Sequence, residues 1–196
     1  MFSPTNGLNV KTTDITSAEF DILARTYLTT AFRMEMLPQY LVDHLNPNFK
    51  AFLAGDPIPP PNPAGTRWSD MIREHVAAGR IMARVHILPD KLTPYLKYEI
   101  EWGYTKNAVA GDDIRIMLPD RCDQELRRVL TQDFWIFDDE LVVLVDYDPQ
   151  GRFKGLRRIG NGESIAIYQD VKRLSWERSI PLSEFLSLWR QNKIYS

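Results

Sequence analysis

The residues of this chain with the most chemical potential are charged side chains that interrupt apolar stretches. Arg33 and Glu35 lie in the segment AFRMEML, Arg84 interrupts RIMARVHIL, and Glu99 lies within KYEIEWG. Asp133 directly precedes the fully apolar segment FWIF. Burying an unpaired charge is costly, so each of these residues must either reach water or contact a complementary charge.

Two interpretations of these charges remain open. In the first, they form internal salt bridges and caps that stabilise the fold. In the second, they line a polar pocket in which guanidinium groups hold a carboxylate or phosphate while the acids hold a cationic or hydroxyl group.

Standard catalytic, cofactor and metal signatures do not occur in the sequence. His44, His75 and His86 are far apart, and none belongs to a zinc-binding motif, so no metal site is expected. The GNG at 160–162 lacks the spacing of a nucleotide-binding loop and is interpreted as a turn before a helix. Cys122 has no histidine near it in sequence and is interpreted as a small apolar residue. We therefore expect no cofactor.

Composition favours one soluble domain. The chain has 196 residues, 44% of them hydrophobic, with 24 basic and 26 acidic residues and a single cysteine. A lone cysteine and the lack of an apolar run near 18 residues favour a soluble, cytoplasmic protein without a membrane partner. The balanced charge argues against direct nucleic-acid binding.

Charge is unevenly distributed along the chain. Residues 101–150 carry 5 basic and 12 acidic side chains, and residues 151–196 carry 9 basic and 4 acidic ones. The simpler explanation is that the two segments lie together and neutralise each other, and the alternative is a molecule with one acidic and one basic face.

Helical patterns dominate the first part of the chain after an N-terminal arm at 1–15. Thr16 and Glu19 form a capping box, and the periodicity that follows predicts a helix that Pro38 must end at or before Leu37. A second helix is predicted at 47–54 with Asn46 as its cap. The proline-rich loop at 56–65 is interpreted as a spacer before a third helix that ends near residue 79.

Strand patterns begin at residue 80. Alternation predicts a strand over 80–88, and a short strand is predicted at 113–118. Residues 93–103 are ambiguous and favour a helix slightly, and Asp120 is the expected cap of a helix that ends at Leu130. The segments 134–137 and 141–145 predict adjacent antiparallel strands at the centre of a sheet, followed by a third strand at 152–159. Two helices should close the chain, over 163–176 and around 182–189.

These patterns predict a single α+β domain over residues 16–196. Its core would be an antiparallel sheet of about four to five strands, with the N-terminal helices on one face and the C-terminal helices on the other.

Three segments of the chain carry a family resemblance. AFRMEMLPQY, RVHILPDKLTPYLKYEIEWGYTKNAVAGDDIRIM and DFWIFDDELVVLVDYDPQGRFKG resemble the actinobacterial family catalogued as domain of unknown function 6879, over roughly residues 16–180. The resemblance implies an association with small helix-turn-helix regulators and assigns no reaction. Together with the embedded charges, its motifs give the following candidate binding residues: Arg33, Glu35, Arg84, Tyr95, Glu99, Asn107, Asp113, Arg115 and Asp133.

Three functional hypotheses follow. The first is a non-enzymatic regulatory module that binds a helix-turn-helix regulator or a small polar ligand. The second is a hydrolase or nuclease-like enzyme in which Glu99 or Asp133 is the general base and Arg33 or Arg84 holds an oxyanion. The third is direct DNA binding through basic residues of the last two helices, which the acidic middle segment would oppose.

Overall fold

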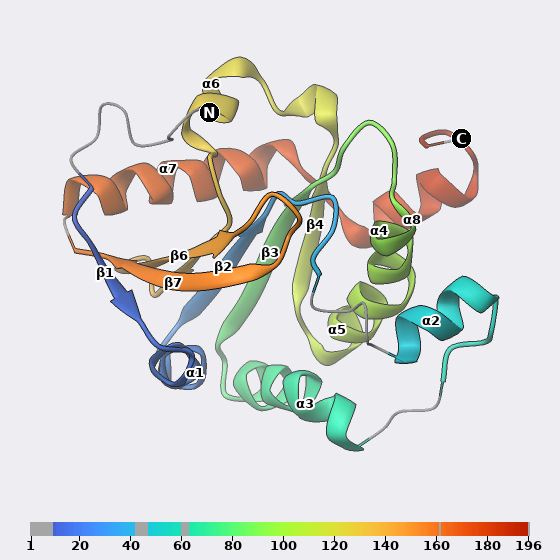
Figure 1. Cartoon of the computed structure of the whole chain (residues 1–196), viewed down its shortest axis with the longest axis horizontal. Helices are drawn as coiled ribbons and strands as arrows, with labels where there is room; N and C mark the ends of the chain where they lie inside the picture. The colour runs from blue at the N-terminus through green and yellow to red at the C-terminus, as the bar shows by residue number, and fades with distance from the viewer. Residues whose placement is uncertain (1–9, 42–46, 60–62, 161, 196) are drawn as a thin grey trace.

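One mixed β-sheet organises the chain. The computed structural model describes residues 10–41, 47–59, 63–160 and 162–195, and over these residues the sheet has eight strands in the order β1-β7-β6-β5-β2-β3-β4-β8 (Figure 1). Strands β2, β3 and β4 are parallel, and the other pairings are antiparallel. The predicted antiparallel sheet of four to five strands was therefore too small, and it missed the parallel part.

The elements follow one another in this order: β1 (Thr12–Ile15), α1 (Ser17–Thr26), β2 (Thr30–Glu35), α2 (Pro47–Ala54), α3 (Pro63–Ala77), β3 (Ile81–Ile87), α4 (Pro94–Tyr98), the π-helix η1 (Glu99–Tyr104), α5 (Thr105–Ala110), β4 (Asp113–Met117), the 3-10 helix η2 (Pro119–Arg121), α6 (Gln124–Val129), β5 (Phe134–Phe137), β6 (Leu141–Tyr147), β7 (Phe153–Ile159), α7 (Gly162–Arg178), β8 (Ile180–Pro181) and α8 (Leu182–Arg190).

Several predicted elements are confirmed. The capping box of Thr16 and Glu19 begins α1, and α2 has the predicted bounds. Strands β5, β6 and β7 form the predicted antiparallel run within the sheet, and the ambiguous segment after Thr93 is helical. The predicted cap Asn46 lies outside the described residues, as do residues 60–62 of the proline-rich loop.

The first helix is shorter than predicted. It ends at Thr26, and the segment that carries Arg33 and Glu35 is strand β2. The Asp138 carboxylate accepts hydrogen bonds from the backbone amides of Leu28, Thr29 and Thr30, which fixes the chain in a turn directly before the strand. β2 is then paired on both sides, by β3 and β5, and this tertiary pairing overrides the local helical pattern.

The helix after β4 also begins later than predicted. Asp123, and not Asp120, is its cap, and its side chain accepts a hydrogen bond from the Leu126 amide. Asp120 lies in the short η2 that precedes it.

Helices cover both faces of the sheet. α7 lies along one face, where it packs with α6, and α1 and α3 lie against the other (Figure 1). The prediction that the C-terminal helices share one face of the sheet was wrong for α8, which packs with α4 and η1 near β4. The proline-rich segment separates α2 from α3, although α3 already begins at Pro63 within it.

Ion pairs connect the acidic segment 101–150 with the basic segment after it. They join Arg157 to Asp146, Lys172 to Asp139, Arg178 to Asp123 and Arg152 to Asp148. The simpler explanation of the uneven charge, mutual neutralisation within the fold, is confirmed for these pairs.

Candidate functional site: a buried network of acids and arginines

Two neighbouring parallel strands position the centre of the network. Arg33 and Glu35 on β2 are aligned with Arg84 and His86 on β3. Side chains two residues apart on a strand share a face, so all four point to the same side of the sheet, near the carboxyl ends of both strands. Such ends are where open α/β sheets commonly bind ligands.

Glu35 is the central acid of the network. Its Oε1 lies 2.9 Å from Arg33 Nη2, and its Oε2 lies 3.1 Å from Arg84 Nη1. The Tyr104 hydroxyl lies 2.9 Å from the same Oε2 and can donate to it. Burial opposes ionisation of Glu35, but the two guanidinium groups outweigh burial and lower its pKa to about 2. Glu35 is therefore a carboxylate at neutral pH.

Asp112 holds the other side of Arg84. Arg84 Nε and Nη2 both contact Asp112 Oδ2, at 2.9 and 2.7 Å. Asp112 directly follows Gly111, the left-handed residue that ends α5, and it precedes β4. The two arginines and the two acids Glu35 and Asp112 thus compensate one another's charge.

His86 extends the network toward η1. Its Nδ1 lies 2.6 Å from the Tyr104 hydroxyl, and its Nε2 lies 3.1 Å from the Leu37 carbonyl oxygen. A carbonyl only accepts, so Nε2 must carry a proton. Burial lowers the pKa of His86, and in the neutral ring Nδ1 is then an acceptor. The single proton of Tyr104 therefore has two acceptors within reach, Glu35 and His86.

Glu99 is a buried acid beside this histidine. Its Oε1 accepts a hydrogen bond from the Tyr95 hydroxyl at 3.1 Å, and its Oε2 lies 3.7 Å from His86 Nδ1. Burial and the nearby Glu35 carboxylate raise the pKa of Glu99 to about 8. The two groups would form an ion pair only if both were charged, and burial works against both charges. We therefore treat Glu99 as protonated and His86 as neutral at pH 7.

Asp133 is a second acid with a raised pKa. It accepts hydrogen bonds from the Tyr40 hydroxyl at 2.5 Å and from the Met36 amide at 3.0 Å. Burial raises its pKa to about 7, although Arg33 acts in the opposite direction. The Arg33 guanidinium contacts the rings of Tyr40 and Trp135, with its central carbon 5.7 and 5.5 Å from their centres.

Three buried polar atoms of the network have no hydrogen-bond partner in the described part of the chain: Arg33 Nε, Glu99 Oε2 and Asp112 Oδ1. The side chains of Arg33 and Glu99 are 21% and 15% exposed, against 5% or less for Glu35, Arg84 and His86. Solvent therefore reaches the network at Arg33 and Glu99.

Six of the nine predicted site residues belong to this network: Arg33, Glu35, Arg84, Tyr95, Glu99 and Asp133. The side chains of the other three are not part of it. Asp113 points to the α7 face of the sheet, and Arg115 binds Ser179 and lies against Trp176 there. Asn107 contributes a backbone carbonyl that accepts from the Asp112 amide.

Sequence reasoning missed four members of the network: Tyr40, His86, Tyr104 and Asp112. His86 could have been found, because it is two residues from Arg84 in a strand and must share its face. Among the described residues, no group of three or more His, Cys, Asp or Glu side chains could hold a metal ion. No described helix is both long and apolar enough to cross a membrane.

The fold and the network together define a mixed α/β domain with a single sheet and a buried acid and arginine network at the carboxyl ends of two parallel strands. The chain belongs to the family described as domain of unknown function 6879, which matches residues 18–187.

Two solved structures have a similar chain trace. One is TrmBL2, an archaeal chromatin protein reported to show a novel mode of DNA binding, at 12% identity and a TM-score of 0.47, with 89% of this chain and 55% of that chain covered. The other is Nuc from Salmonella typhimurium, a phospholipase D family member, at 10% identity and a TM-score of 0.48, with 88% and 97% covered. The chain thus spans about half the length of the archaeal protein. No curated protein matches the chain.

Proposed function

We propose that the chain is a regulatory module that binds a small polar ligand at the buried network, and that the ligand donates hydrogen bonds to Glu99. The observation that carries the proposal is the set of buried, unpartnered polar atoms on Arg33, Glu99 and Asp112. Buried polar atoms in folded proteins nearly always have a partner, so a cluster of exceptions in one network favours a binding site.

The charges in the network favour one ligand chemistry over another. Arg33 and Arg84 are already compensated by Glu35 and Asp112, so little positive charge is left for an anion. Glu99 is instead held as a neutral acid beside Glu35. A protonated amine could displace the proton of Glu99 and donate to its ionised Oε2, and a hydroxyl could form a hydrogen bond with the same carboxyl group. We therefore favour a small amine or polyol over a carboxylate or phosphate.

A thermal-shift experiment with small probes tests this proposal. Ethanolamine, putrescine and glycerol represent donors, and inorganic phosphate and acetate represent anions. We expect the amines to raise the melting temperature of the wild-type chain, because a ligand that binds only the folded state stabilises it. The effect should grow between pH 6 and pH 8, because an ammonium group favours the ionised form of Glu99.

Two variants test whether the response to amines depends on Glu99. Glu99→Gln should remove the response to amines, whereas Glu101→Gln, an exposed acid in the same π-helix, should retain it. Stabilisation by phosphate or acetate but not by amines would overturn the proposed ligand chemistry.

The regulatory part of the proposal rests on the helix-turn-helix regulators that the family resemblance implies as partners. Copurification of such a regulator with the wild-type chain, in amounts that depend on the amine, would support it. Direct DNA binding is not part of the proposal, because acidic side chains outnumber basic ones in the chain as a whole.

A hydrolase or nuclease-like enzyme is the second candidate, and one observation favours it: Glu99 and His86 form an acid and base pair 3.7 Å apart. With a pKa of about 8, Glu99 would act as a general acid at pH 7, and not as the general base expected from the sequence. Turnover of a phosphodiester probe that is lost in Glu99→Gln and retained in Glu101→Gln would favour this candidate over the binding module.

A further inference from the structure

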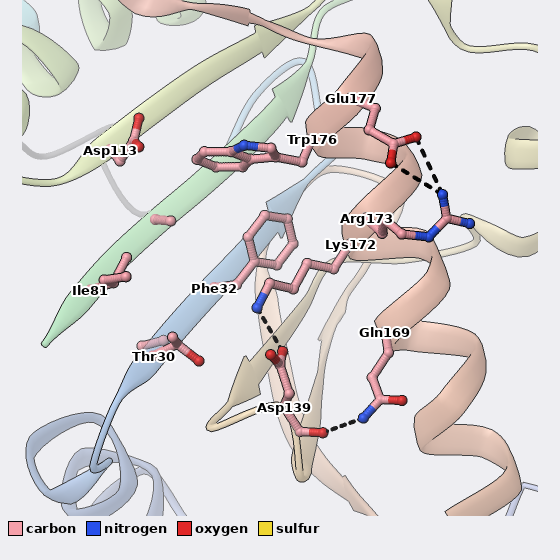
Figure 2. Close-up of a pocket in the computed structure, with 12 residues that line it drawn as sticks. Thr30, Phe32, Ile81, Asp113, Asp139, Gln169, Lys172, Arg173, Trp176 and Glu177 are labelled. Carbon is pink, nitrogen blue, oxygen red and sulfur yellow. Dashed lines mark hydrogen bonds and ion pairs between the residues drawn. The ribbon is translucent and has the colours of Figure 1, made fainter.

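A second concave site lies on the opposite face of the sheet. A half-open cavity of about 520 Å³ lies between α7 and the first residues of β2, β3 and β4 (Figure 2). The buried network lies on the other face and near the other ends of β2 and β3. The two sites therefore share strands but no lining side chain.

Strand register explains why this cavity exists. Phe32 on β2, Ala83 on β3 and Asp113 on β4 lie side by side in one row across the sheet. The middle residue of the row is small, so the floor of the cavity is lowered between its two larger neighbours. Ile81, one step along β3 on the same face, leaves 55% of its surface exposed at the edge of the cavity. Its position beside the cavity makes this apolar surface available to a bound molecule.

Aromatic side chains form part of the wall. Trp176 extends from α7 over the strands, and its ring meets the Phe32 ring edge to face, with 6.4 Å between centres (Figure 2). The cavity volume is within the range of small-molecule pockets, which are mostly apolar with a few polar groups. Its walls therefore suit a flat apolar molecule.

The charges at the rim are paired, with one exception. Lys172 Nζ lies 2.6 Å from Asp139 Oδ1, and Arg173 Nη1 lies 3.2 Å from Glu177 Oε1 (Figure 2). The exposed Asp113 carboxylate forms no ion pair within the described part of the chain. Arg115, two residues further along β4, is held by Ser179 and Trp176 and does not line the cavity. Among the lining side chains of the described residues, Asp113 is therefore the one charge without an ion-pair partner.

We propose that this pocket binds a small organic cation with a flat apolar body. The apolar body lies against Ile81, Ala83 and the indole of Trp176, and the cationic group lies near Asp113. The Arg115 guanidinium lies over the Trp176 ring, 4.9 Å from its centre, so the indole offers the ligand apolar contact and the attraction for the cationic group comes from Asp113. The site does not depend on the proposed ligand of the buried network.

Two fluorescent probes of the same three-ring shape and opposite charge test the proposal: N-methylacridinium, a cation, and 9-anthracenecarboxylate, an anion. We expect the wild-type chain to bind the cation more tightly than the anion in a fluorescence titration. Asp113→Asn should weaken binding of the cation about twofold to fivefold, which is the usual effect of one exposed charge pair. Raised salt should reduce this difference.

Ala83→Leu should fill the floor and weaken binding of the cation further. Asp14→Asn, an exposed acid on β1 at the far edge of the sheet, is the matched control and should bind like the wild type. Equal or tighter binding of the anion would overturn the proposal, as would equal binding by the wild type and Asp113→Asn. If Ala83→Leu does not fold, the comparison of Asp113→Asn with Asp14→Asn decides alone.

Discussion

Asp112 and Asp113 are adjacent in sequence but have different roles in the structure. Asp112 is buried against Arg84, whereas Asp113 is exposed on the opposite face beside the cavity. The sequence analysis selected Asp113, the first residue of the strand predicted at 113–118, and passed over Asp112, which directly precedes that strand. Successive strand residues point to opposite faces, so a shift of one residue exchanges a buried ion-pair partner for an exposed acid.

This difference in burial predicts that two conservative substitutions change the free energy of unfolding by very different amounts. Asp112→Asn should lower the free energy of unfolding by about 3–5 kcal/mol, because it removes one of the two negative charges that compensate the buried Arg84. Asp113→Asn should change stability by no more than about 0.5 kcal/mol, as is usual for an exposed site. Urea denaturation of both variants measures this, and equal losses would contradict the placement of the two side chains.

At the scale of elements, the sequence predicted the strands best where the pattern was unambiguous. FWIF and LVVLV are apolar on both alternating faces, and they pair inside the sheet as predicted. β2 was mistaken for helix, since its residues continue the helical spacing of α1 and only its partners β3 and β5 distinguish the two structures. The strands predicted at 80–88 and 113–118 are confirmed as β3 and β4, but their parallel pairing was missed, because it joins residues 51 apart for β2 and β3 and 30 apart for β3 and β4 and leaves no local signal.

One turn connects the β6–β7 hairpin to the candidate site. Gly151 has a φ of 81°, and its carbonyl accepts a hydrogen bond from the Leu41 amide at 3.0 Å. A Cβ at Gly151 would lie 2.3 Å from the Gln39 carbonyl oxygen. The glycine thus allows the hairpin to approach the backbone on both sides of Tyr40, the hydrogen-bond donor to Asp133.

We expect Gly151→Ala to be more destabilising than Gly79→Ala, measured by urea denaturation. Gly79 has a similar φ of 79° but open space around its Cβ, so alanine there has only the cost of the left-handed backbone, about 1–2 kcal/mol. Gly151→Ala has this cost and the clash with Gln39 as well. Similar losses of unfolding free energy in the two variants would show that Gly151 does not lie in close contact with the backbone beside Tyr40.

At the scale of the whole molecule, the sequence identified most of the charges but not how they assemble. Arg33, Glu35, Arg84, Glu99 and Asp133 were singled out because each interrupts an apolar segment, and the structure brings all five into one network. Tyr40 and Tyr104 were missed, since a tyrosine in an apolar segment is as compatible with ordinary packing as with hydrogen bonding to an acid. Their role follows only from the tertiary contacts.

The raised pKa values of Glu99 and Asp133 affect the stability of the whole chain. An acid with a higher pKa in the folded than in the unfolded state binds its proton more tightly when folded. Its contribution to stability is fully present below the unfolded pKa, which is near 4.5 for Glu99, and is lost as the pH rises through the folded pKa of about 8. Asp133 acts in the same direction up to about pH 7. Glu35 acts oppositely, but its contribution is lost only as the pH falls from about 4.5 toward 2. His86 and His75 also act oppositely, because burial lowers their pKa values and their contribution is lost as the pH falls below the usual histidine value of 6.5.

The free energy of unfolding of the wild type and Glu99→Gln between pH 5 and pH 8 therefore tests most directly whether Glu99 is held as a neutral acid in the network. Glu101→Gln serves as the control. The histidines are common to all three proteins, so the difference between the profiles isolates Glu99. We predict that from pH 5 to pH 8 the stability of the wild type and the control falls relative to that of Glu99→Gln by at least about 1 kcal/mol, the equivalent of a pKa shift of about one unit. Parallel pH profiles of the wild type and Glu99→Gln over this interval would contradict this account.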